Sequence, residues 1–113
     1  MSVLMASYGQ ERPINATAEE LAVFDVVREV LDQNGLDASI LELTRKADSY
    51  VTAVIRSKEY GPIDVCRFKF SPRTAWIMFP LRGTARVKIT SPDDVRQYAE
   101  ELKKEYLWQV KYL

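Results

Sequence analysis

The sequence contains no histidine and only one cysteine, Cys66, among its 113 residues. Catalytic triads that use a histidine base are therefore excluded, as are zinc and iron sites with histidine ligands. One cysteine is too few for an intramolecular disulfide or a cysteine-rich metal site, and a lone cysteine fits a reducing compartment. We accordingly expect no metal or other cofactor and no enzymatic activity.

Clustered glycines, long apolar runs and a secretory signal are also missing. The four glycines lie at positions 9, 35, 61 and 83, so no glycine-rich loop can hold a phosphate group. No stretch approaches the roughly 18 apolar residues that cross a bilayer. The first 13 residues have neither the basic segment nor the apolar run of a signal peptide. These patterns predict a cytoplasmic protein that does not contact a membrane.

Net charge is zero, with 16 acidic and 16 basic residues, yet the charges are sorted along the chain. Residues 1–44 have 8 acids and 2 bases, residues 45–88 have 3 acids and 10 bases, and residues 89–113 have 5 acids and 4 bases. The net charges of these segments are therefore −6, +7 and −1. The basic middle segment predicts a surface of one sign, which bears on the choice of partner.

Two helices are predicted, one near each end of the chain. Residues 17–20 have the capping-box pattern, so a helix should run from residue 18 to residue 33, where Asn34 and Gly35 end it. Ser91, Pro92 and the acids Asp93 and Asp94 should start the second helix. Its apolar stripe predicts that it reaches Tyr106 or beyond.

Between the helices, apolar residues recur at every second position, which indicates β-strands. Five strands are predicted, over residues 40–45, 50–57, 64–70, 74–81 and 86–90. The connections between them are short, which favours an antiparallel meander over crossovers. Residues 1–15 should be an irregular or disordered lead-in, in which Val3–Met5 is a candidate edge strand.

This order of elements predicts an α+β fold for a single domain that covers residues 1–113. The N-terminal and C-terminal helices should pack on one face of a single antiparallel sheet of about five strands, because each has an apolar stripe to cover. On the third strand, alternation places Cys66 and Phe68 toward the helices. Val65 and Arg67 should then lie on the opposite face.

The sheet face away from the helices is the first candidate site. Its predicted residues combine bases with aromatic rings: Tyr50, Arg56, Arg67, Lys69, Trp76, Arg86 and Lys88. Cations neutralise phosphates and rings stack on bases, so this combination is typical of a surface for single-stranded nucleic acid. The alternative is a solvated face on which arginine and lysine stems cover Trp76 and Tyr50. No RNP-type aromatic motif, recognition helix or zinc finger accompanies the pattern.

The C-terminal tail is the second candidate site, because residues 106–113 are apolar on more than one helix face. Tyr106, Trp108 and Tyr112 are the predicted interface residues, since aromatic side chains are favoured at interface cores. These residues could pack on the sheet of their own chain, cover the edge of that sheet or form a homodimer contact, and these alternatives remain open.

The remaining reactive groups have structural explanations. Asp93 and Asp94 fit a helix cap. Asp64 stands alone at a strand entrance, and the following residues 67–69 have a base where a metal-dependent nuclease would need an acid. Cys66 is expected to be a buried and inert thiol.

The leading hypothesis is a small non-enzymatic binding module whose basic and aromatic sheet face contacts an anionic partner. Nucleic acid is the most concrete partner, and an acidic protein surface is the next. The alternative hypothesis is a structural or regulatory subunit that dimerises or docks through its C-terminal helix.

Overall fold

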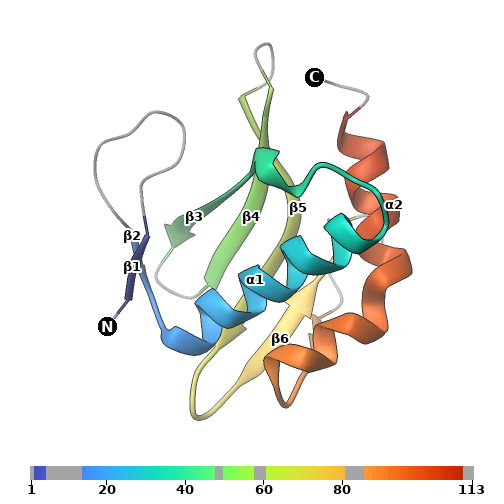
Figure 1. The fold of residues 1–113 in the computed structure, drawn as a ribbon. Coiled ribbons are helices and arrows are strands. Elements are labelled where there is room, and N and C mark those ends of the chain that lie inside the picture. The colour runs from blue at the N-terminus through green and yellow to red at the C-terminus, as the bar shows by residue number, and fades with distance from the viewer. Residues whose placement is uncertain (1, 5–13, 48–49, 58–60, 81–85, 111–113) are drawn as a thin grey trace.

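The structure, a computed structural model, describes residues 2–4, 14–47, 50–57, 61–80 and 86–110 (Figure 1). In chain order its elements are β1 (Ser2–Leu4), β2 (Ile14–Ala16), α1 (Ala18–Gln33), the 3-10 helix η1 (Ala38–Ile40), β3 (Leu41–Ala47), β4 (Tyr50–Ser57), β5 (Gly61–Phe70), β6 (Ala75–Met78), β7 (Arg86–Lys88), the 3-10 helix η3 (Pro92–Tyr98) and α2 (Ala99–Val110). Within these residues, neither α-helix combines the length and the apolar character needed to cross a membrane.

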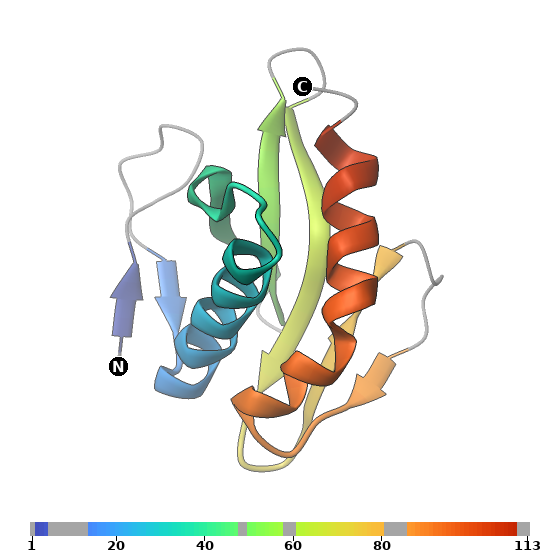
Figure 2. The ribbon, with the colours of Figure 1, turned by 45° about the vertical axis from the view of Figure 1, so that its right-hand side comes forward.

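Strands β3 to β7 form one antiparallel sheet in chain order, which confirms the predicted meander. Helices α1 and α2 lie on the same face of this sheet, and α2 runs alongside β5 (Figure 2). Val27 of α1 and Leu102 of α2 join Ile55 and Phe68 of the sheet in one core. The predicted α+β architecture is therefore confirmed.

A bulge in β5 changes which residues face the core. Ala53 of β4 pairs with Cys66, whereas the next residue, Val54, pairs with Asp64. Val65 is therefore an extra residue on β5, with no residue of β4 directly opposite. It is fully buried in the core on the helix side, so its prediction on the opposite face was wrong. The extra residue breaks the strict alternation on which that prediction depended.

The N-terminal strands form a separate two-stranded sheet. Ser2–Leu4 pairs antiparallel with Ile14–Ala16, and β2 contacts β3 (Figure 1). The sequence predicted a strand close to this place, at Val3–Met5, but its partner is β2 rather than the edge of the main sheet. Residues 5–13 of the predicted lead-in lie outside the described residues.

The C-terminal helix begins with 3-10 geometry. The Asp94 N–H donates to the Ser91 carbonyl at 3.1 Å, and this bond to the third residue back winds the chain more tightly than an α-helix. The Asp94 carboxylate accepts from the hydroxyl and the N–H of Thr90, both at 2.6 Å, and these bonds hold the pKa of Asp94 below its usual value. The predicted capping role of Asp94 is confirmed, but apolar spacing did not reveal the 3-10 segment.

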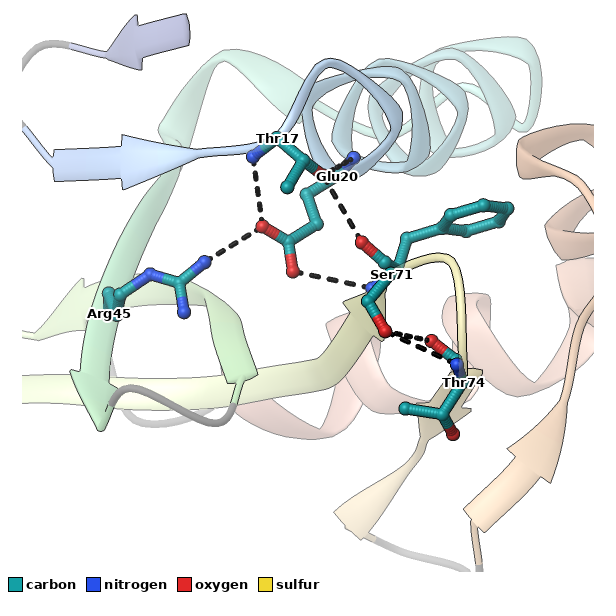
Figure 3. A network of polar contacts seen from close by, with 6 residues as sticks. Thr17, Glu20, Arg45, Ser71 and Thr74 are labelled. Carbon is teal, nitrogen blue, oxygen red and sulfur yellow. Dashed lines mark hydrogen bonds and ion pairs between the residues drawn. The ribbon is translucent and has the colours of Figure 1, made fainter. Parts of the chain in front are cut away.

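The start of α1 is fastened to two strands through the carboxylate of Glu20, which is only 3% exposed (Figure 3). One carboxylate oxygen accepts from the Thr17 N–H at 3.0 Å, and the Thr17 hydroxyl accepts from the Glu20 N–H at 3.0 Å, which completes the predicted capping box. The same carboxylate oxygen accepts from Arg45 Nη2 at 2.8 Å, and the other accepts from the Phe70 N–H at 3.3 Å. The helix cap therefore also joins α1 to β3 and β5.

The cap of α1 also supplies Phe70 with the main-chain hydrogen-bond partners that a neighbouring strand would otherwise provide. Val51 and Phe68 are the last paired residues of β4 and β5 at this end, so Phe70 lies beyond that pairing. Its N–H donates to Glu20, and its carbonyl accepts from the Thr17 hydroxyl at 3.2 Å. Both main-chain polar groups of Phe70 therefore have partners where the ladder with β4 has ended.

Replacing Glu20 with alanine should lower the free energy of unfolding by about 3 kcal/mol, because the Arg45 guanidinium and the Phe70 N–H lose their acceptor. Urea denaturation followed by circular dichroism measures the loss. Glu19→Ala is the matched control, since it removes the exposed carboxylate of the neighbouring residue and should change stability by only about 0.5 kcal/mol. Equal losses in the two variants would contradict the role given to Glu20.

Candidate anion-binding face

The strand register arranges the predicted binding residues in two rows on the face away from the helices. Trp76 of β6 lies between Lys69 of β5 and Lys88 of β7. In the next row, Met78 lies between Arg67 and Arg86. Six of the seven residues predicted for binding thus come together, and we call them the basic face: Tyr50, Arg67, Lys69, Trp76, Arg86 and Lys88.

Arg56, the remaining predicted residue, lies apart from the basic face. It pairs with Pro62 near the other end of β4, and its Nε lies 3.8 Å from the carboxylate of Glu42. Asp64, predicted to lack a companion acid at the strand entrance, has an arginine as its partner. Both Nε and Nη2 of Arg67 donate to Asp64 Oδ2, at 2.9 and 2.7 Å, so the charge of Arg67 is partly neutralised within the sheet.

Arginine side chains cover the aromatic rings of the basic face. The Arg86 guanidinium lies 4.2 Å from the centre of the Trp76 ring, and that of Arg67 lies 5.6 Å from the centre of the Tyr50 ring. The two ring centres are 6.0 Å apart. Trp76 and Met78 are each only 7% exposed. Arginine over both rings agrees with the alternative prediction, in which basic stems cover Trp76 and Tyr50, rather than with an open stacking surface. The cation–π contact with Arg86 and the neighbouring Tyr50 ring contribute to the burial of Trp76.

A hollow of about 710 Å³ borders the basic face where the β5–β6 turn meets β7, and we call it the β7 groove. Its described lining contains no acidic residue and consists of residues 70–76 with Arg86, Lys88, Ile89 and Thr90. Arg73, in the turn, adds a base beside the hydroxyl groups of Ser71 and Thr74. Sequence reasoning treated residues 71–73 only as a turn and missed Arg73, although a base between two basic strands was a usable signal.

Several bases at this corner have no acidic side chain within ion-pair distance among the residues that the structure describes: Lys69, Arg73, Arg86 and Lys88. The other arginines that the structure describes are paired, as Arg45 is with Glu20 at 2.8 Å. A concave surface lined by charges of one sign focuses the electrostatic potential. The β7 groove and its surroundings are therefore arranged to attract an anion.

The aromatic residues of the C-terminal helix do not form one surface. Tyr106 is buried, and its hydroxyl donates to the Asp37 carbonyl at 2.9 Å, so it packs within its own chain rather than in the predicted interface. Leu107 and Trp108, the next two residues, are each 43% exposed. Tyr112, the third predicted interface residue, lies outside the described residues.

Comparisons with protein-family models, curated proteins and solved structures found no match. Within the described part of the chain, no group of three or more cysteine, aspartate or glutamate side chains is placed to hold a metal ion. Function must therefore be inferred from the chain's own side chains, and the basic face is the group of them that was predicted to bind a partner and that the strand register brings together.

Cys66 should be unreactive in the folded protein. It is fully buried, and this burial, with the charges of Glu105 and Asp64, raises the pKa of its thiol. Because the thiolate is the reactive form, a disulfide reagent such as Ellman's should label native protein at least about 100-fold more slowly than protein unfolded in guanidinium. Labelling of the native protein at the rate of a free thiol would show that the strand carrying Cys66 opens readily.

Proposed function

We propose that the protein is a small non-enzymatic binding module whose basic face contacts an anionic partner. The observation that supports this most strongly is the group of bases around the β7 groove that have no acidic partner among the described residues. Like charges held close together repel one another, and a bound anion relieves this repulsion. An anion placed between Arg73, Arg86 and Lys88 is attracted by all three bases.

Of the two partners suggested by the sequence, an acidic protein segment fits the basic face better than single-stranded nucleic acid. Base stacking requires an open ring face. Trp76 is 7% exposed and lies beneath Arg86, while Tyr50 lies beside Trp76 and Arg67, so a base would have to displace these side chains. A carboxylate needs only the cations, with which it forms charge-assisted hydrogen bonds.

The basic face should bind a fluorescent peptide in which glutamate alternates with valine, called here the alternating peptide. Fluorescence anisotropy should show at least about tenfold weaker binding when salt rises from about 50 to about 300 mM, because salt screens exposed charges. Arg86→Glu combined with Lys88→Glu should weaken binding at low salt by at least about 30-fold, since attraction becomes repulsion.

The matched control for this charge reversal is Lys103→Glu combined with Lys104→Glu, which changes the net charge equally on α2, in the helix layer. It should retain binding within about threefold, because any remaining effect is long-range and screened. Labelled oligothymidine and oligouridine are tested in parallel. Stronger binding of an oligonucleotide than of the peptide would favour the nucleic-acid form of the proposal, and no binding of any anionic probe at low salt would refute it.

A second proposal is a subunit that docks through α2, and the observation that favours it is the pair of adjacent apolar residues Leu107 and Trp108, each 43% exposed. Exposed tryptophan is favoured at protein interfaces because its large ring gains much contact area at little cost in entropy.

Two substitutions only two residues apart on α2 separate packing within the chain from docking. Tyr106→Phe should lower the free energy of unfolding by about 1 kcal/mol, because the Asp37 carbonyl loses its donor, and should leave the oligomeric state unchanged. Trp108→Ala should shift any dimer toward monomer in sedimentation velocity. A wild-type chain that sediments as a monomer at high concentration would count against docking between copies.

A further inference from the structure

We propose that β7 accepts an extended acidic peptide segment as a sixth, antiparallel strand of the sheet, with acidic side chains at alternate positions facing Arg86 and Lys88. This inference rests on the proposed function and specifies the partner and its mode of binding. Among the described elements β7 is the outermost strand on its side of the sheet and pairs only with β6. An added strand gains affinity from main-chain hydrogen bonds and specificity from alternate side chains.

The main-chain groups that such a strand needs point outward from β7. The Ile89 N–H donates to the Ala75 carbonyl at 3.2 Å, so Ile89 directs its main-chain groups toward β6. Val87, two residues earlier and paired with Ile77, has the same direction. Because direction alternates along a strand, the N–H and carbonyl groups of Arg86 and Lys88 face away from β6. Among the described strands none lies beyond them, so they form an outer edge of the sheet.

The side chains of Arg86 and Lys88 determine which sequence would fit this edge. Both are exposed and project to the face away from the helices. In an antiparallel pair, residues directly opposite one another place their side chains on the same face, about 5 Å apart. Residues opposite Arg86 and Lys88 are therefore two positions apart and should be acidic. The residue between them lies opposite Val87, which is half-buried on the helix side, and should be apolar.

The β7 groove extends this recognition beyond the strand. Thr90 and Arg73 line the groove past the C-terminal end of β7. A partner chain long enough to extend past this end of β7 therefore meets a third base. A second copy of β7 is a poor partner, because its bases would lie opposite Arg86 and Lys88, and like charges directly opposite one another destabilise a strand pair. The basic edge thus disfavours self-association and favours an acidic strand.

The test follows individual amide hydrogens by NMR hydrogen exchange of the full chain, with and without the alternating peptide. In the free protein the amides of Arg86 and Lys88 should exchange rapidly, while those of Val87 and Ile89, bonded toward β6, should be slower. Saturating peptide should slow exchange at Arg86 and Lys88 by at least about tenfold. Unchanged exchange at both amides, with the peptide bound, would overturn strand addition.

Two N-methylated peptides provide the matched control, because both keep the charge and the sequence of the alternating peptide. In the proposed antiparallel pair, the glutamate N–H groups point toward β7 and the valine N–H groups point away. Methylation of the glutamate nitrogens should therefore weaken binding by at least about tenfold, since two hydrogen bonds are lost, whereas methylation of the valine nitrogens should change it by less than about twofold.

The outcomes distinguish the failure of this inference from the failure of the proposed function. If both methylated peptides bind as well as the parent, the contact is purely electrostatic: strand addition is refuted and the anion-binding function stands. If an oligonucleotide binds at the basic face and the peptide does not, strand addition is likewise refuted. If no anionic probe binds, both proposals fall. Circular dichroism confirms that each protein variant is folded.

Discussion

The carboxylate of Glu20 is the contact on which the arrangement of the two layers depends. A buried charge is costly unless it is paired and hydrogen-bonded. Glu20 meets this requirement by accepting hydrogen bonds from the Thr17 N–H, from Arg45 and from the Phe70 N–H (Figure 3). These donors come from the helix cap, from β3 and from the end of β5. One side chain therefore holds the start of α1 against β3 and β5.

The face of the sheet away from the helices has a different chemistry. Because both helices pack on one side, the bases of β5 and β7 collect on the other, and the register places Lys69, Trp76 and Lys88 in one row across three strands. Acidic residues are concentrated on α1, where Asp25 and Glu29 are exposed. A chain with zero net charge therefore has acidic and basic sides. Such a distribution can steer an anion toward one face over distances of about a Debye length.

Local signals in the sequence were sufficient for the elements and insufficient for contacts between them. The capping box and its apolar stripe predicted α1 with the observed bounds, residues 18–33. The same pattern could not show that Glu20 also binds Arg45 and Phe70, because these residues are distant in the chain. The burial of Trp76 depends on Arg86 crossing from the neighbouring strand, and that of Val65 depends on a bulge. Alternation along a single strand contains neither piece of information. It identified most of the basic face, but it could not decide between open rings and rings covered by basic stems.

Native-state hydrogen exchange at the Phe70 amide tests the central claim most directly. If the Glu20 carboxylate joins the layers, this amide is bonded to a side chain whose release requires the helix cap to separate from the sheet. Its exchange should then require an opening free energy within about 1 kcal/mol of that for the Phe68 amide in the sheet core, with a similar dependence on denaturant. Exchange at Phe70 that is much faster and independent of denaturant would show local fraying, and would contradict a structure held together at Glu20.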